Sequence, residues 1–382
     1  IVAMFFLCTY GMINLAAFVE SFGGNPSFRP RFRLYHWTTS LLGFLACAVV
    51  MTLIDAKAAM VAVLVILILY VLISRRVFSS AFGDARRGFQ YSLVVRSLQK
   101  LRNMDVHPKN WRPSFLVMGG ASAARLPMIK YANWMEGGRG LMTVAQVVSG
   151  DLETFAGRAE GMRAATESVL KDNDLQAFTE IVFAEDVDAG IRMLVQAHSI
   201  GPLKPNTVVL GWPHTEERAL AVYQHVRGIA ALGKSVVLVS DRELPIPKTD
   251  PHCIDIWWRG QANGSLMITL AYLLTQNWEW RNSEIRILRL IPDDAGRESS
   301  RQVLQELIHS ARIPAQACVI VSSDPFSEVL QSHSAQADLV FLGLPYQDDE
   351  HVIINYRHLN LTLENMPTTV LVRSSGEADF SV

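Results

Sequence analysis

The polar residues with the clearest chemical potential lie in an apolar stretch at the start of the chain. Tyr10 and Asn14 stand four residues apart there, one turn along the same face of a helix. Polar groups inside a membrane helix are costly unless they meet neighbouring helices or line a pathway. A phenolic hydroxyl is a neutral donor, suited to holding a partly dehydrated anion without trapping it. Helix–helix hydrogen bonding and a role in ion transport both remain open for this pair.

A second candidate is the sequence GGAS at 119–122, which follows a short apolar run. Backbone amides in such a loop can meet an anion or a nucleotide phosphate at the beginning of a helix. Gly119, Gly120 and Ser122 are therefore a candidate anion or nucleotide loop. A tight turn from a strand into a helix is the simpler interpretation of the two glycines.

Catalytic constellations are absent from the sequence. It has no G-x-S-x-G elbow, no H-E-x-x-H, no C-x-x-C and no P-loop. The 4 cysteines are widely separated and match neither a disulfide framework nor a metal site. His107 and His214 have no suitable partner in the sequence and are expected in loops. We expect no catalytic residues, no metal ligands and no required cofactor.

The elements that must position Tyr10 are long apolar runs. Residues 38–54 and 58–74 form two uncharged runs of about 17 residues each, separated by a short tip that contains Asp55 and Lys57. Such a helix spans roughly 25 Å, close to the thickness of about 30 Å of a bilayer core. The pattern predicts a transmembrane hairpin over 38–74. A soluble buried hairpin is the less favoured alternative.

Residues 1–20 predict one more transmembrane helix. The chain begins with Ile1 rather than Met, and the stretch has neither the basic region nor the cleavage pattern of a signal peptide. We therefore expect a transmembrane helix that is truncated at its start, three such helices in all, and an upstream portion of the protein that precedes Ile1.

Basic residues in the connecting segments predict the orientation of these helices. The hairpin tip carries only Lys57, whereas the basic linker over 21–37 and the segment after residue 74 are rich in arginine: Arg29, Arg31, Arg33, Arg75, Arg76, Arg86 and Arg87. Positive residues concentrate on the cytoplasmic side of membrane proteins. Residues 75–382 are therefore expected in the cytoplasm.

The remainder of the chain predicts a soluble α/β fold. An amphipathic connecting helix is expected within 75–110, either packed on its own domain or forming a dimer contact. From residue 111 onward, short β-branched runs, such as the strands expected at 235–239 and 254–258, alternate with helical stretches, which is typical of mainly parallel sheets. The net charge of −1 and the lack of a basic face exclude a nucleic-acid partner.

The strand pattern restarts after a polar, proline-rich segment at 241–251. Residues 206–213 resemble 337–345, and the tripeptide VLV at 237–239 recurs at 370–372. Two matches at nearly the same offset indicate an internal duplication. We expect two α/β subdomains, over 111–245 and 252–382.

Five motifs, in order along the whole chain, resemble the cation-chloride cotransporters. They are FFLCTYGMIN at 5–14, FRPRFRLY at 28–35, KNWRP at 109–113, KPNTVVLGWP at 204–213 and IDIWW at 254–258. The resemblance implies the C-terminal portion of a secondary active transporter that moves chloride electroneutrally with potassium, sodium or both. The three helices would close a twelve-helix bundle in the lipid bilayer. The soluble part would be a regulatory domain of two universal-stress-protein-like subdomains that supports homodimerisation.

One functional residue follows from this resemblance. Tyr10 matches the tyrosine of the tenth helix whose hydroxyl helps to form a chloride site, whereas Asn14 matches a motif position without a ligand role. Universal-stress-type nucleotide sites carry further glycines after the fourth strand. His214 and Tyr346 stand there instead, which argues against ATP binding.

Two other interpretations of the chain remain open. The first is a membrane-tethered nucleotide sensor, in which the helices only anchor the α/β units; a tether does not require Tyr10 and Asn14. The second is a membrane-bound α/β enzyme, which has no catalytic constellation to support it.

Overall fold

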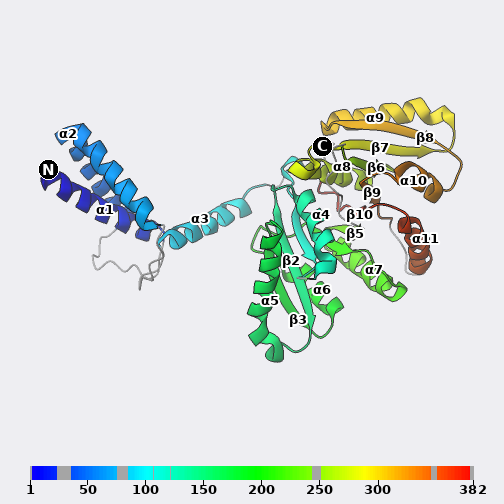
Figure 1. Ribbon diagram of the computed structural model, residues 1–382, viewed down its shortest axis with the longest axis horizontal. Helices are drawn as coiled ribbons and strands as arrows, with labels where there is room; N and C mark the ends of the chain where they lie inside the picture. Colours follow the sequence, from blue (N-terminus) through cyan, green and yellow to red (C-terminus); the bar gives the residue numbers. More distant parts are fainter. Residues whose placement is uncertain are drawn as a thin grey trace. The chain divides into compact units, whose positions relative to one another are not determined.

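The structure, a computed structural model, describes residues 2–23, 36–74, 85–105, 107–120, 122–242, 251–345 and 351–378. They divide into two compact units, Ile1–Met104 and Asp105–Val382 (Figure 1). Five arginines used above for the orientation lie outside the described residues: Arg29, Arg31, Arg33, Arg75 and Arg76.

The first unit consists of three helices, α1 (Val2–Phe22), α2 (Trp37–Ser74) and α3 (Ala85–Arg102). Two glycines bring α1 and α2 close together. A Cβ on Gly11 would lie 3.5 Å from the Cβ of Cys47, and a Cβ on Gly43 would lie 2.7 Å from Oδ1 of Asn14. Small residues at such contacts let helix backbones approach closely, which favours packing in an apolar environment.

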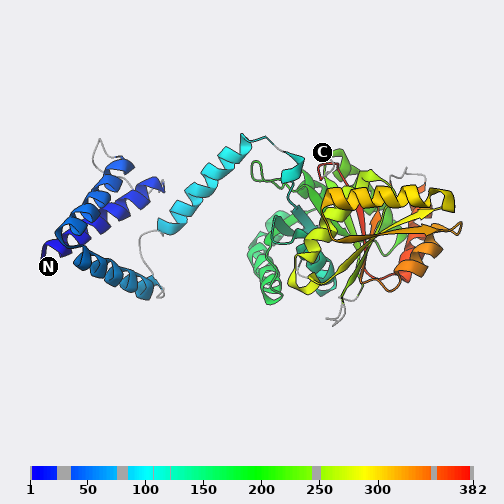
Figure 2. The ribbon, with the colours of Figure 1, turned by 90° about the horizontal axis from the view of Figure 1, so that it is seen from above.

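The long helix α2 is interrupted at Asp55, where φ is −162° and ψ is 105°. Figure 2 shows its two halves diverging from this bend. Oδ1 of Asp55 accepts hydrogen bonds from the backbone amides of Lys57 and Ala58 at 2.9 and 3.2 Å, as a capping residue does at the start of a helix. Within the described residues two helices, Ala3–Phe22 and Trp37–Leu69, are long and apolar enough to cross a membrane. The expected count of three is therefore not confirmed.

Side chains of α3 complete the end of α1. Nη2 of Arg96 donates to the carbonyl oxygen of Phe22 at 2.9 Å, and its guanidinium lies 4.3 Å from the centre of the Phe22 ring. Oγ of Ser92 donates to the carbonyl oxygen of Gly23, and Phe89 packs on Phe22 at 5.7 Å between ring centres. The last carbonyl groups of a helix have no partner within it, so these contacts satisfy groups that α1 cannot satisfy itself.

The second unit is built on one ten-stranded sheet with the order β3-β2-β1-β4-β5-β10-β9-β6-β7-β8. Its strands are β1 (Ser114–Met118), β2 (Leu141–Ser149), β3 (Phe178–Ala184), β4 (Thr207–Gly211), β5 (Ser235–Ser240), β6 (Cys253–Trp257), β7 (Glu284–Ile291), β8 (Ala315–Val321), β9 (Leu339–Gly343) and β10 (Thr369–Arg373). The order of β1 to β5 is repeated by β6 to β10, and neighbours within each half are parallel. The predicted, mainly parallel α/β fold is confirmed.

The two halves meet in a way that the sequence does not predict. β5 and β10 pair antiparallel, with Leu238 opposite Leu371, and this seam joins both halves into a continuous sheet. The four strand residues Val236–Val239 are all fully buried there. Apolar packing therefore continues across the seam, and no solvent-filled boundary separates the two halves of the sheet.

Helices cover both faces of this sheet. One face carries α4 (Leu126–Glu136), α5 (Leu152–Asp172), α8 (Gln261–Thr275) and α9 (Arg297–Ala311). The opposite face carries α6 (Val187–Ala197), α7 (Glu216–Ala231), α10 (Phe326–Ser334) and α11 (Val352–Glu364). Strands buried on both faces read as continuous apolar runs, as β4 and β5 do. The exposed carboxyl ends of the strands are left as the place for polar chemistry.

Candidate functional site

Tyr10 lies on the face of α1 that does not pack against α2. Its side chain is 59% exposed, and Phe6 and Ile13 share this exposed face. The hydroxyl has no hydrogen-bond partner among the described residues. Tyr10 is therefore available to groups outside this unit.

From the sequence, Asn14 is expected to lie on the same helix face as Tyr10, but its side chain is engaged by other groups. Its Nδ2 donates to the backbone carbonyl of Tyr10 at 2.9 Å, and its Oδ1 lies close to Gly43 of α2. The structure therefore separates the pair, because Asn14 takes part in packing between α1 and α2 while Tyr10 is left exposed.

The candidate loop of the second unit borders a cavity of about 280 Å³ at the carboxyl ends of β1, β2 and β4. Gly119 lines this cavity, whereas Gly120 and Ser122 are not among its lining residues. Gly120 has φ of 68°, a left-handed conformation that favours glycine, and a Cβ there would lie 2.9 Å from the side chain of Gln146. Ser122 makes no capping hydrogen bond. These features fit a tight turn that leaves one glycine on the cavity wall.

Arg125, which the sequence analysis did not single out, reaches into this cavity from a short 3₁₀ turn (Ala123–Arg125) ahead of α4. A Cβ on Gly211, the last residue of β4, would lie 2.1 Å from Nη1 of Arg125. The guanidinium therefore covers the end of β4, and it has no carboxylate partner among the described residues. The gap between β1 and β4 is where the strand order reverses, which is the usual ligand position in open α/β sheets.

Two other lining residues of this cavity, Arg218 and His225, contact the carboxylate of Asp188. Oδ1 of Asp188 accepts from Nη1 of Arg218 and contacts Nε2 of His225, both at 2.8 Å. Burial raises the pKa of Asp188, but the hydrogen bonds from His225 and Arg218 outweigh it and hold this pKa below its ordinary value. Arg125 is thus the unpaired charge of the cavity.

The histidines expected in loops occupy the positions of loop residues. His214 is exposed and lines the same cavity. His107 precedes a 3₁₀ turn (Pro108–Asn110), and its Nδ1 accepts from the amide of Lys109 at 3.1 Å. Tyr346 lies outside the described residues. The described residues contain no group of three or more His, Cys, Asp or Glu that could hold a metal ion.

In the second half of the sheet, the end of β9 corresponds to the end of β4, and a neutral side chain covers it. Asn263 of α8 lies over Gly343, the last residue of β9, with Nδ2 at 3.1 Å from a Cβ placed there. Its Oδ1 accepts from the amide of Ser374 at 2.9 Å, and its Nδ2 donates to the carbonyl of Leu344 at 3.4 Å. Both ends of the amide are therefore engaged by backbone.

Family models match almost the whole chain in sequence. "Amino acid permease" matches residues 1–117, "Solute carrier family 12" matches 125–227, and "Prokaryotic cation-chloride cotransporter, C-terminal domain, 2nd" matches 250–378. Potassium/chloride cotransporter 3 of Caenorhabditis elegans is 29% identical over 334 residues, which are 83% of this chain and 31% of that protein. The chain thus spans about a third of the length of this relative.

Two solved structures each match 70% of this chain. The cytoplasmic domain of a prokaryotic cation chloride cotransporter covers 70% of this chain and 97% of its own length, with a TM-score of 0.48 and 16% identity. A universal stress protein from Archaeoglobus fulgidus DSM 4304 covers 70% and 99%, with a TM-score of 0.45 and 11% identity.

The apolar helices α1 and α2, followed by an α/β unit, together with the matches to family models, define a multi-pass integral membrane protein. In sequence, the chain is similar to the cation-chloride cotransporters over most of its length.

Proposed function

We propose that this chain is the C-terminal part of a secondary active transporter that moves chloride electroneutrally together with potassium, sodium or both. Similarity to the cation-chloride cotransporters supports the reaction class. The observation that carries the proposal is Tyr10, whose hydroxyl faces away from α2 on a helix apolar enough to cross the membrane and has no partner in the part of the chain that the structure describes.

The two halves of α2 cross the membrane separately in this proposal. Each half is about 18 residues long and so roughly 27 Å in length, enough for one crossing. The capped break at Asp55 would lie at the outer surface beside Lys57, and α1 would be a third span. The chain would then contribute the last three helices of the bundle.

Tyr10 would donate its hydroxyl to a dehydrated chloride ion. A neutral donor lowers the cost of leaving water without binding the ion so tightly that release becomes slow. In the longer protein, Tyr10→Phe should lower chloride-dependent flux while expression persists. Tyr91→Phe on α3 is the matched control, because it removes the same hydroxyl from another exposed position. Unchanged flux and chloride affinity in Tyr10→Phe would contradict the chloride role.

The part of the chain after the apolar helices, which comprises α3 and the second unit, would serve as the dimerisation and regulatory domain. α3 exposes two aliphatic side chains, Leu93 and Val94, each more than half exposed. Exposed apolar residues of this kind on one helix favour burial against a second copy. Sedimentation should give a dimer at micromolar concentration, weakened by Leu93→Glu. A monomer at that concentration would contradict this part of the proposal.

A second candidate function, anion or nucleotide sensing, is favoured by Arg125. Its unpaired guanidinium at the β1–β4 edge, next to Gly119, is placed to meet a phosphate. Calorimetry with ATP on residues 105–382 tests it, with Arg125→Gln as the binding-site variant. Tight binding that Arg125→Gln abolishes would support a sensor; absence of heat would leave the domain without a required cofactor.

A further inference from the structure

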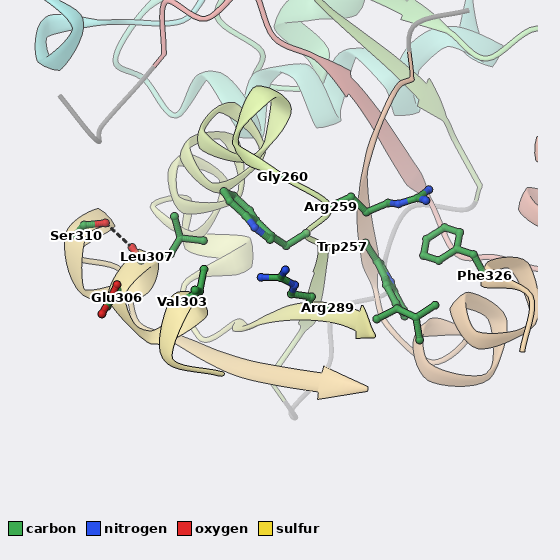
Figure 3. A pocket seen from close by; sticks show the side chains of 11 residues that line it. Trp257, Arg259, Gly260, Arg289, Val303, Glu306, Leu307, Ser310 and Phe326 are labelled. Atoms are coloured by element: carbon green, nitrogen blue, oxygen red, sulfur yellow. Dashed lines mark hydrogen bonds between the residues drawn. The ribbon is translucent and has the colours of Figure 1, made fainter. Parts of the chain in front are cut away.

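A second and larger cavity lies in the second half of the sheet, at the carboxyl ends of β6 and β7. Its volume is about 630 Å³, and α9 and the start of α10 form its outer walls (Figure 3). It is separate from the cavity beside Arg125, which belongs to the first half, and among the five motifs named above only IDIWW contributes to it, through Trp257 and Trp258. Volumes of about 300 to 1,000 Å³ are usual for small-molecule sites.

Two arginines without ion pairs border this cavity. Arg289 is on β7 and half-buried, and Arg259 is the second residue after the end of β6. Neither guanidinium forms a hydrogen bond or an ion pair with the described residues, and that of Arg259 lies 5.1 Å from the ring centre of Phe326. Figure 3 shows Arg289 extending into the middle of the cavity, while Arg259 turns toward Phe326. Glu306 is the single carboxylate among the lining residues, so the lining carries a net positive charge.

A neighbouring arginine shows that this lack of pairing is particular to the cavity. Arg286 stands three residues before Arg289 on the same strand. Its Nε and Nη2 donate to Asp255 at 2.7 Å each, in a bidentate ion pair. The guanidinium of Arg286 is therefore paired with a carboxylate, whereas the N–H groups of Arg259 and Arg289 are available to a ligand.

Rigid aromatic rings form the apolar wall. Trp258 is 5% exposed, and its ring fills a space that α8 leaves only because residue 264 is glycine; a Cβ there would lie 1.8 Å from the indole. Trp257 is fixed by a hydrogen bond from Nε1 to Oγ of Ser334 at 3.0 Å, and that hydroxyl donates to Asp255 at 2.5 Å. A wall held in place before binding costs little entropy when a ligand arrives.

We infer that this cavity binds an organic phosphate. The phosphate would accept from the guanidinium of Arg289, with Arg259 rotating from Phe326 to share it. A planar or apolar body would lie against Trp258, Val303 and Leu307. Guanidinium forks match the paired oxygens of phosphate, and the positive lining disfavours a cation or a neutral polar molecule. A soluble phosphate ester and a lipid headgroup present the same chemistry to these residues.

The test uses the purified chain in detergent with three probes: phenyl phosphate, inorganic phosphate, and a short-chain, water-soluble phosphatidic acid. Tryptophan fluorescence and calorimetry report binding of all three. Phenyl phosphate should bind about tenfold more tightly than inorganic phosphate, because only it reaches the aromatic wall. Binding of the phosphatidic acid but not of phenyl phosphate would assign the site to a lipid headgroup.

Variants separate the site from the fold. Arg289→Gln should weaken binding of phenyl phosphate by about tenfold or more, and Arg259→Gln by severalfold, since charge-assisted hydrogen bonds are lost. Val303→Glu, at an exposed wall position, should repel the phosphate without disturbing the core. Arg281→Gln, an exposed arginine outside the lining, is the matched control and should change nothing. Failure of all three probes to bind, or binding unchanged in Arg289→Gln and Val303→Glu, would overturn the inference.

Discussion

The two halves of the ten-stranded sheet have the same strand order but different chemistry at equivalent positions. Phe115 pairs with Met142 and Thr207, as Ile254 pairs with Ile285 and Leu339. By this register Gly119 and Gly120 correspond to Trp258 and Arg259, and Gln146 corresponds to Arg289. The first half therefore has glycines and one unpaired arginine, Arg125, at its edge, and the second half has an aromatic edge with two arginines, Arg259 and Arg289, that are unpaired among the described residues.

The same register reveals a difference inside the sheet. Leu116 and Asp255 are equivalent and both fully buried, and Thr143 corresponds to Arg286. One half fills this position with apolar packing and the other with an ion pair. The two halves thus keep the same layers and strand order although equivalent side chains differ. These side chains decide what each edge of the sheet can bind.

The largest effect is expected where the halves differ in the core. Asp255→Ala leaves Arg286 without its partner, and should lower the free energy of unfolding by about 3 kcal/mol. This is the lower end of the range for buried pairs, because the Arg286 side chain is 31% exposed. Urea denaturation of residues 105–382 measures it.

Copying the first half into the second provides the control. Asp255→Leu combined with Arg286→Thr reproduces the pair Leu116 and Thr143, and removes both charges together. The double variant should lose less stability than Asp255→Ala, since no buried charge is left unpaired. If the double variant loses as much stability as Asp255→Ala or more, then the attraction between Asp255 and Arg286 stabilises this half. The cost of leaving one charge unpaired would then not explain the effect of Asp255→Ala.

A smaller effect is expected from two glycines, one on each side of the seam. Gly264→Ala should cost about 2 kcal/mol, because the new Cβ meets the buried Trp258 ring, which cannot move aside. Gly211→Ala meets only the end of the flexible Arg125 side chain, and should cost less than about 0.5 kcal/mol. Urea midpoints that rank the two glycines in the reverse order would refute the described packing.

The smallest effect concerns pH and belongs to the first half alone. The pKa of Asp188 is lower in the folded state than its ordinary value of about 3.9, so its contribution is complete above that value. It is lost as the pH falls through the lowered pKa, because the unfolded chain then binds more protons. Arg218→Ala should reduce this loss between pH 5 and pH 2 by at most about 1 kcal/mol, since the pair is partly exposed. The difference between the urea midpoints at pH 5 and pH 2 should be smaller for Arg218→Ala than for the unaltered protein. If the two proteins show the same difference, the pair of Asp188 and Arg218 does not contribute to the pH dependence of stability.

The sequence predicts the strands well because β-branched runs buried on both faces are a strong local signal. The run expected at 235–239 is β5 (Ser235–Ser240), and the run expected at 254–258 is β6 (Cys253–Trp257), displaced by one residue. The antiparallel seam could not be foreseen. An apolar run such as 237–239 or 370–372 is equally suited to either direction of pairing. Its partner is chosen by packing between segments far apart in the chain.

The site residues were harder to predict than the fold. Gly119 was singled out and lines a cavity, but Arg125, Arg259 and Arg289 were missed. Arginines in or near loops resemble ordinary surface residues in a sequence. Their importance depends on whether a carboxylate is within reach, as it is for Arg286 and is not for these three among the described residues. Tyr10 remains a prediction that only ion flux can test.

The contact between α3 and the end of α1 has a mechanical consequence. Ser92 and Arg96 hold the carbonyl groups of Gly23 and Phe22, so the last turn of α1 can fray only when α3 withdraws. A displacement of α3 is thereby converted into melting or winding of that turn, about three helical turns from Tyr10. The rate of amide hydrogen exchange in the last turn of α1 would then rise when α3 is displaced and fall when α3 is in contact with α1.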